Sequence, residues 1–249
     1  MNKNEYLKRI NYQNEIHVDD ETLMQLHEHH VLYVPFENLD VHYKRFFDLA
    51  LERLYKKIVV HNRGGFCYEL NTLFNALLNN IGFKSSIIAA RIFDDLDNLG
   101  PEYDHICLYV ETDKKYLADV GFGDLFTKPL EIKEGIQSDG RNLFKIEHFK
   151  GQNFVLSMSS DKTNFRKKYM FNLKAVQIHE FHQICSDKQT NPQSYFVKNT
   201  ICTKPTSTGR LTLFNNKLIE KRNTERIEQL IHNDAELRTV LKTVFGITV

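Results

Sequence analysis

One cysteine stands where a nucleophilic thiol is expected. Cys67 follows the glycine pair Gly64-Gly65 and begins a stretch in which apolar residues recur at helical spacing. A cysteine attacks as its thiolate, a form that a helix N-terminus and a neighbouring imidazolium both favour. The sequence therefore predicts that Cys67 lies at the start of a buried helix, after a flexible turn, and that it needs a histidine partner.

A histidine and an aspartate of suitable chemistry occur in a predicted β-hairpin. Residues 105–110 and 114–119 are strand-like and flank a short turn. If that turn is centred on Thr112, His105 lies directly opposite Asp119, with Cβ atoms about 5 Å apart. The carboxylate would then orient the imidazole and stabilise its charged form, as in a Cys–His–Asp triad. A longer turn would shift the pairing and break this contact.

Two glycines follow the candidate aspartate, in Gly121-Phe122-Gly123. Glycines at this place allow backbone N–H groups to approach a phosphate or an oxyanion. A simple β-bulge is an equally good interpretation of the same residues.

The elements that must position these residues change from helical to strand-like along the chain. Apolar spacing predicts helices over residues 21–32, 48–60 and 70–81, the last ended by Gly82. The predicted strands are residues 86–93, 105–110, 116–120, 143–148, 154–158 and 175–178. Residues 224–245 again predict a helix. This order, helices followed by strands and a helical end, is typical of an α+β fold.

Composition excludes several classes of function. The 249 residues include 33 basic and 32 acidic ones. The chain therefore lacks the excess of basic residues that is typical of nucleic-acid-binding proteins. No apolar run approaches the roughly 18 residues of a membrane span, and the first ten residues lack the apolar core of a signal peptide. We therefore expect a cytoplasmic protein with no membrane or nucleic-acid partner.

Neither the remaining cysteines nor the histidine clusters predict a metal site. Cys107, Cys185 and Cys202 form no C-x-x-C pair and are interpreted as ordinary core or surface thiols. The segment 27–30, His-Glu-His-His, lacks the spacing of H-E-x-x-H, and the segment 179–182 fails in the same way. Both segments are interpreted as packed or solvated faces, and we expect no bound metal.

Several motifs resemble those of the arylamine N-acetyltransferase family. Residues 63–71, Arg-Gly-Gly-Phe-Cys-Tyr-Glu-Leu-Asn, resemble its active-site motif, and residues 35–39, Pro-Phe-Glu-Asn-Leu, resemble its P-F-E-N block. Asp104-His105 resembles the family's histidine strand, and residues 118–123 resemble its aspartate block. Tyr6–Ile10, residues 191–196 and residues 244–247 resemble its opening and C-terminal motifs, so the resemblance spans nearly the whole chain in the right order.

The resemblance implies a fold and a reaction. The implied fold is an N-terminal helical bundle (residues 1–83), a middle β-barrel (84–190) and a C-terminal α/β lid (191–249). The implied activity is ping-pong acetyl transfer from acetyl-CoA to an arylamine or arylhydrazine, with no permanently bound cofactor.

The resemblance also implies roles for individual residues. The triad would be Cys67, His105 and Asp119. Arg63 would pair with Glu37 to support the site. The acceptor pocket would be lined by Phe36, Phe93 and Phe122, and the turn of Gly121, Phe122 and Gly123 would lie near the CoA pyrophosphate.

The chain departs from the family pattern in three ways, and other functions stay open. It has no tryptophan, its C-terminal part is short, and Phe93 is bulky for a pocket wall. The alternatives are a related amide synthase with another acyl donor, a thiol hydrolase or transglutaminase-like enzyme with the same triad, and a non-catalytic CoA-binding protein.

Overall fold

The N-terminal third of the chain is helical. In the computed structural model, which describes residues 1–46, 48–222 and 225–249, it contains α1 (Lys3–Arg9) and α2 (Asp20–Tyr33). Asp19 caps α2, because its carboxylate accepts the Thr22 N–H at 2.8 Å. The helix ends two residues before Pro35, as expected because a proline disfavours helical backbone in the residue preceding it.

Two further segments lead to the longest helix. The predicted helix over residues 48–60 is shorter in the structure, as α4 (Leu51–Tyr55) followed by a π-helical turn, Lys56–Val60. The helix α5 (Cys67–Ile81) buries its apolar stripe and stops at Gly82, whose φ of 119° suits glycine. A short helix, α3 (Leu39–His42), lies between α2 and α4.

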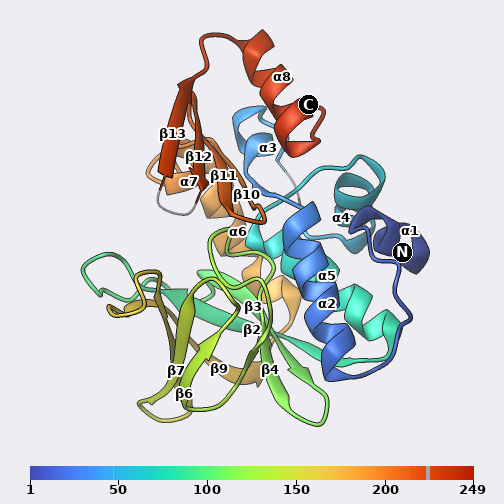
Figure 1. Cartoon of the computed structure of the whole chain (residues 1–249), viewed down its shortest axis with the longest axis vertical. Helices are drawn as coiled ribbons and strands as arrows, with labels where there is room; N and C mark the ends of the chain where they lie inside the picture. Colours follow the sequence, from blue (N-terminus) through green and yellow to red (C-terminus); the bar gives the residue numbers. More distant parts are fainter. Residues whose placement is uncertain (47, 223–224) are drawn as a thin grey trace.

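Eight antiparallel strands from the middle part of the chain form one sheet, which lies at the bottom of the molecule in Figure 1. In spatial order they are β5 (Leu130–Glu131), β4 (Lys115–Ala118), β3 (His105–Glu111), β2 (Lys84–Ile92), β9 (Arg166–Ala175), β8 (Asn153–Ser159), β7 (Leu143–Phe149) and β6 (Gly135–Ser138). The two outer strands are bridged by the Gln137 side chain. Its amide donates to the Glu131 carbonyl at 2.7 Å and accepts the Glu131 N–H at 2.9 Å, so the sheet is nearly closed into a barrel.

A second sheet builds the lid. Its strands, in spatial order, are β1 (Phe36–Glu37), β10 (Ile201–Pro205), β11 (Gly209–Phe214), β12 (Lys217–Arg222) and β13 (Glu225–Leu230). Helix α8 (Asp234–Phe245) packs on this sheet through an apolar cluster that includes Leu213, Leu241 and Phe245. Because β1 comes from the helical N-terminal part, the lid sheet is joined directly to the segment that precedes α3.

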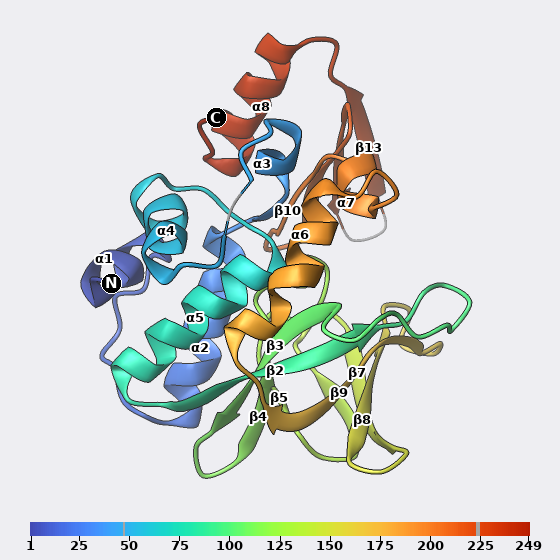
Figure 2. The same cartoon turned by 180° about the vertical axis from the view of Figure 1, so that it is seen from behind.

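A helical connection links the barrel to the lid. It contains a 3₁₀ turn (Ile178–Phe181), α6 (His182–Thr190) and α7 (Tyr195–Lys198). Figure 2 shows α6 running from the barrel, past the start of α5, toward the lid sheet. This part of the chain therefore lies beside the N-terminus of α5.

Two predictions of local structure are wrong. Residues 175–178 are not a strand, because β9 ends at Ala175 and a 3₁₀ turn begins at Ile178. The predicted helix over residues 224–245 begins only at Asp234. Residues 225–230 instead form β13, in which every residue is exposed and pairs with β12. Thr224, the first residue of that prediction, lies outside the described residues.

The architecture confirms the expected α+β fold of a helical bundle, a β-barrel and an α/β lid. The limits at residues 83 and 190 stay a prediction. Among the described residues, no helix is long and apolar enough to cross a membrane.

Candidate active site

Cys67 is the first residue of α5. Its preceding residue, Phe66, has extended backbone, and the Phe66 N–H donates to the Glu69 carboxylate at 2.9 Å. Because the Glu69 side chain bonds back to the residue that precedes the helix, it stabilises the first turn of α5. Cys67 is 7% exposed. Its thiol is therefore held at the positive end of a 15-residue helix, as the sequence predicts.

The glycine turn before Cys67 is required by close packing. A Cβ atom at Gly64 would lie 2.0 Å from the carbonyl oxygen of Pro35, far inside van der Waals contact. The N–H of Glu37 donates to the Gly65 carbonyl at 3.0 Å, which joins this turn to β1. The turn before α5 is thus closely packed and hydrogen-bonded in the structure, whereas the sequence predicts a flexible one.

His105 and Asp119 are in direct contact. His105 Nε2 lies 2.7 Å from Asp119 Oδ2, and both side chains are almost completely buried. His105 also has a side-chain hydrogen bond with Cys67. Because Nε2 faces the Asp119 carboxylate, Nδ1 is the ring nitrogen available to the thiol. The structure therefore brings together the three residues that the sequence predicts as a triad.

The predicted strand register is wrong, although the contact exists. In the β3–β4 pairing Glu111 faces Lys115 and Leu108 faces Ala118, so the turn is centred on Asp113 rather than Thr112. His105 and Asp119 are therefore diagonal neighbours, with Asp119 just beyond the end of β4. Long side chains on the same face can bridge this diagonal.

Three hydrogen-bond donors hold the Asp119 carboxylate. Its Oδ1 accepts the Asn71 amide at 2.9 Å and the Gly121 N–H at 3.0 Å, while Oδ2 contacts His105. Asn71 lies one turn after Cys67 on α5 and also accepts the Val120 N–H at 2.9 Å. One amide side chain thus connects the helix of the cysteine to the loop of the aspartate.

The electrostatics of this group favour a charged histidine. Burial lowers the pKa of His105, but the charges of Asp119 and Cys67 and the hydrogen bonds to both outweigh burial and raise it to about 10. Burial by itself raises the pKa of Asp119, whereas His105 and the donors around its carboxylate bring the net value below the ordinary one. At neutral pH the pair is therefore an imidazolium with a carboxylate.

The glycine turn after Asp119 packs against Cys67. A Cβ atom at Gly121 would lie 2.6 Å from Cys67 Cα and 2.7 Å from the Asn71 amide nitrogen. Gly123 has a φ of 89°, and a Cβ there would lie 3.2 Å from the Phe36 ring. Both positions require glycine, and the turn is placed directly beside the thiol.

Two of the three phenylalanines predicted to bind the acceptor lie at the site. The Phe122 ring meets the His105 ring edge-on, with centroids 5.2 Å apart, and Phe36 stacks on Phe66 at 6.0 Å. Phe93 instead faces Leu99 in a β-bridge, and the Lys167 ammonium lies over its ring. Its role in the acceptor pocket stays a prediction.

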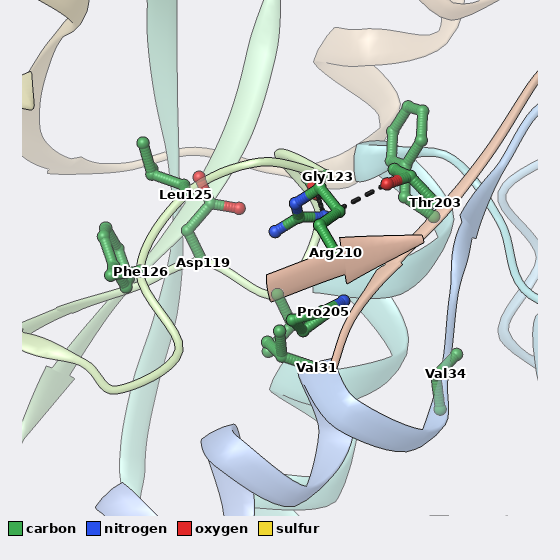
Figure 3. Close-up of a pocket in the computed structure, with 11 residues that line it drawn as sticks. Val31, Val34, Asp119, Gly123, Leu125, Phe126, Thr203, Pro205 and Arg210 are labelled. Atoms are coloured by element: carbon green, nitrogen blue, oxygen red, sulfur yellow. Dashed lines mark hydrogen bonds between the residues drawn. The ribbon is translucent and has the colours of Figure 1, made fainter. Parts of the chain in front are cut away.

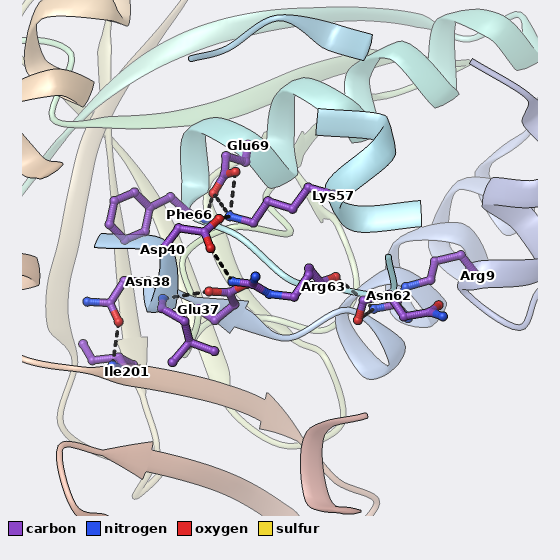
Figure 4. A network of polar contacts seen from close by, with 11 residues as sticks. Arg9, Glu37, Asn38, Asp40, Lys57, Asn62, Arg63, Phe66, Glu69 and Ile201 are labelled. Carbon is purple, nitrogen blue, oxygen red and sulfur yellow. Dashed lines mark hydrogen bonds and ion pairs between the residues drawn. The ribbon is translucent and has the colours of Figure 1, made fainter. Parts of the chain in front are cut away.

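A buried charge network supports the start of α5 (Figure 4). Arg63 donates to Glu37 at 2.8 and 2.9 Å and to Asp40 at 2.9 Å. Lys57 contacts Asp40 at 2.9 Å and Glu69 at 2.8 Å. Burial raises the pKa of Glu69 to about 7 despite this lysine. The network connects β1, α3 and the π-helical turn to the helix that carries Cys67.

A small pocket lies behind Asp119, where α2, the loop after β4 and the lid meet (Figure 3). It is lined by Val31, Val34, Phe36, Asp119, Val120, Gly123, Leu125, Phe126, Thr203, Pro205 and Arg210. Its volume of about 20 Å³ is enough for one water molecule and not for an aromatic ring. The Arg210 guanidinium, from β11, donates to the Gly123 carbonyl and pairs with Asp124 at 3.1 Å. The lid is thereby tied to the glycine turn.

Sequence reasoning missed the residues that connect the site to its surroundings. Asn71 lies in the recognised motif, so its position on the Cys67 helix was a usable signal. Arg210 and His27 gave no local signal, since each acts on a loop about ninety residues away. Within residues 1–46, 48–222 and 225–249, no group of three or more His, Cys, Asp or Glu side chains has an arrangement that could hold a metal ion.

The chain matches one protein family over most of its length. The sequence profile of a family described as N-acetyltransferase matches residues 19–249. Arylamine N-acetyltransferase, pineal gland isozyme NAT-10, of Gallus gallus is 32% identical over 274 aligned positions, covering 100% of this chain and 94% of that relative. This chain belongs to the arylamine N-acetyltransferase family. Arylamine N-acetyltransferase 1 of Homo sapiens is 29% identical, covering 98% of this chain and 93% of the human protein.

Solved structures of the family share the fold. An arylamine N-acetyltransferase from Salmonella typhimurium has a TM-score of 0.91 and 27% identity, covering 98% of this chain and 90% of that one. The Bacillus cereus family member NAT3 has a TM-score of 0.90 and 25% identity, covering 99% and 98%. That protein is described as having a unique Cys-His-Glu catalytic triad. In the present family member, an acyltransferase, the carboxylate that contacts His105 is an aspartate.

Proposed function

We propose that this enzyme transfers an acetyl group from acetyl-CoA to an arylamine or arylhydrazine through an acetyl thioester on Cys67. The observation that carries the proposal is the buried contact between His105 and Asp119 beside the first residue of α5. A charged histidine next to a thiol at a helix N-terminus favours the nucleophilic thiolate. Cys67, His105 and Asp119 are thus the proposed catalytic residues.

In the first half-reaction, the Cys67 thiolate attacks the carbonyl carbon of acetyl-CoA. The carbon–sulfur bond to CoA breaks, and the departing CoA sulfur takes the proton of the His105 imidazolium. The products are acetyl-Cys67, neutral His105 and free CoA. The N–H of Cys67, among the first amides of α5, is the proposed donor to the developing oxyanion.

In the second half-reaction, the amine nitrogen attacks acetyl-Cys67. Neutral His105 takes a proton from that nitrogen in the tetrahedral intermediate, and the Cys67 thiolate leaves. The products are the N-acetylated amine and the original imidazolium–thiolate pair, so protons and electrons balance over the cycle. Asp119 keeps Nε2 protonated throughout, which presents Nδ1 to the reacting atoms.

The aromatic residues around Cys67 favour an acceptor that contains an aromatic ring. Phe122 lies against His105, and Phe36 lies against the glycine turn, so an incoming flat ring has apolar neighbours near the thiol. Gly121, Phe122 and Gly123 are proposed to lie near the CoA pyrophosphate, since their turn packs on Cys67 without a side chain in the way. Arg63 and Glu37 are proposed to act only as support.

Intact mass spectrometry tests the proposal. Acetyl-CoA mixed with the enzyme in the absence of an amine should add one acetyl group, and 4-aminobenzoate or 5-aminosalicylate should remove it. The adduct should be absent in Cys67→Ala and present in Cys185→Ala, a matched change at another buried free cysteine. An enzyme with a reduced Cys67 that gains no acetyl group would contradict the proposal.

A further inference from the structure

A buried histidine outside the triad contacts both ends of the loop that carries the aspartate. His27 lies on α2, and its ring is completely buried. Its Nε2 lies 3.1 Å from the backbone nitrogen of Asp119, and its Nδ1 lies 2.8 Å from the carbonyl oxygen of Thr127. The ring therefore spans the loop of residues 119–127, which contains the glycine turn.

These partners fix the protonation state of the ring. A backbone N–H only donates, so Nε2 must accept from Asp119. A carbonyl only accepts, so Nδ1 must carry the proton that Thr127 receives. His27 is thus a neutral imidazole with one defined tautomer, and burial, its largest influence, lowers its pKa to about 4, which is consistent with that state.

The ring is also fixed in orientation. It stacks on Phe126 with centroids 5.6 Å apart and meets Phe74 of α5 edge-on at 5.9 Å. Asp119 needs such an external acceptor, because β4 ends at Ala118 and the strand ladder no longer pairs its N–H. Without His27, that buried N–H would lose its only partner in the described structure.

We propose that His27 is a positioning residue of the acetyl-transfer reaction, which holds the Asp119 backbone so that its carboxylate stays aimed at His105. This inference rests on the proposed function. His27 touches neither substrate nor reacting atoms. It acts through Asp119, and its effect is on the orientation and charge of His105.

A second buried histidine on the same helix shows that burial alone does not require such bonds. His30 is also completely buried, three residues further along α2, and packs against Phe74. Neither of its ring nitrogens has a hydrogen-bond partner among the residues that the structure describes. His30 is therefore a matched control, with the same residue type, helix and degree of burial, and without the link to the active-site loop.

Two conservative substitutions separate the two bonds of His27. In His27→Gln, the side-chain oxygen reaches the place of Nε2 and accepts from Asp119. In His27→Asn, the shorter amide reaches only the place of Nδ1 and donates to Thr127. We expect His27→Asn to lower the single-turnover rate of Cys67 acetylation by about 10- to 100-fold. His27→Gln should stay within about fivefold of the wild type and His30→Asn within about twofold.

The pH profile distinguishes positioning from loss of packing. A displaced Asp119 stabilises the imidazolium less, so the pKa of His105 falls and the alkaline limb of the acetylation rate moves to lower pH in His27→Asn. Damage to packing lowers the amplitude of the profile and leaves that limb in place. Equal rates in the Asn and Gln variants, or an unmoved limb, would overturn the inference.

The wild-type enzyme supplies an independent test and separates this inference from the proposed function. Nitrogen NMR of the His27 ring should show a neutral imidazole with its proton on Nδ1 between pH 5 and 8, and a charged ring or the other tautomer would overturn the role of His27 whether or not the variants fold. If the wild type forms no acetyl-enzyme, the proposed function fails. If it forms one and His27→Asn does so equally fast, only the role of His27 fails.

Discussion

Replacing Asp119 by asparagine reverses the hydrogen bond that holds His105. In the wild type, Oδ1 accepts from the Asn71 amide and the Gly121 N–H, so the corresponding atom of an asparagine must remain an oxygen. The new NH₂ group then takes the place of Oδ2, 2.7 Å from His105 Nε2. Two donors cannot face each other, so the ring loses its proton at Nε2 and keeps one at Nδ1, toward Cys67.

The size of the effect follows from the charge state of His105. The pKa of this imidazole is raised from 6.5 to about 10, with the Asp119 charge as the largest raising influence. At 1.36 kcal/mol for each pKa unit, a return of this pKa to 6.5 corresponds to about 5 kcal/mol of imidazolium stability. The Asp119 charge is the largest of the influences that raise the pKa, and Cys67 and the hydrogen bonds supply the others. The fraction of enzyme with an imidazolium at pH 7 then becomes small. We expect Asp119→Asn to acetylate Cys67 about 10³- to 10⁴-fold more slowly, as when the tautomer is wrong in a serine-protease triad.

Single-turnover acetylation by acetyl-CoA, followed by intact mass across pH 6 to 10, measures this change. The control is Asp40→Asn, since Asp40 is also a buried aspartate in ion pairs, to Arg63 and Lys57, and does not touch the triad. That variant should lose stability and stay within about threefold of the wild-type rate. An Asp119→Asn enzyme that folds and keeps a tenth of the wild-type rate would refute the assignment of Asp119.

Three further expectations concern packing, buried charge and pH. Gly121→Ala should lower the acetylation rate about 100-fold or more, because its Cβ would push on the backbone of the nucleophile, whereas Gly151→Ala, in an open turn, should not change this rate. Arg63→Met should lower the free energy of unfolding in urea by about 3–5 kcal/mol, because it leaves buried carboxylates without this cationic partner. Arg226→Met, in an exposed ion pair, should lower it by at most about 1 kcal/mol. A smaller loss for Arg63→Met than for Arg226→Met would contradict the network's role. The pKa of His27 is 6.5 in the unfolded chain and about 4 in the folded one, so between these pH values the unfolded chain binds more protons. We therefore expect the free energy of unfolding to fall by up to about 3 kcal/mol as pH falls from 6.5 to 4. Urea titrations should show a flatter acid dependence in His27→Gln.

The elements around Cys67 were predictable because their signals are local. The apolar stripe after Cys67 has the helical period, and Gly82 marks its end by the positive φ that only glycine adopts readily. The tail shows where such signals fail. Residues 225–230 carry apolar positions that fit a helical stripe, yet pairing with β12 makes them a strand. Hydrogen bonding along a neighbouring strand outweighed a weak helical period.

The contact between His105 and Asp119 shows a different limit. The sequence predicted that the two meet, but only for a turn centred on Thr112, and the expectation that a shifted pairing would break the contact is wrong. The register was not predictable, because one residue more or less in the turn leaves the same alternation of apolar and polar residues. The tertiary structure places the turn one residue later, and Asp119 reaches His105 along the diagonal, from beyond the strand.

The sequence by itself determined the helix that begins at Cys67, the α+β class and the three side chains that we propose as the triad, since each depends on residues within one or two adjacent elements. Only the tertiary structure decided which distant groups hold the triad. His27 on α2 and Arg210 on β11 reach the loop after Asp119 across about ninety residues of chain. Such contacts form because burial leaves backbone N–H and C=O groups without water, and the nearest side chain in space, wherever it lies in the sequence, must satisfy them.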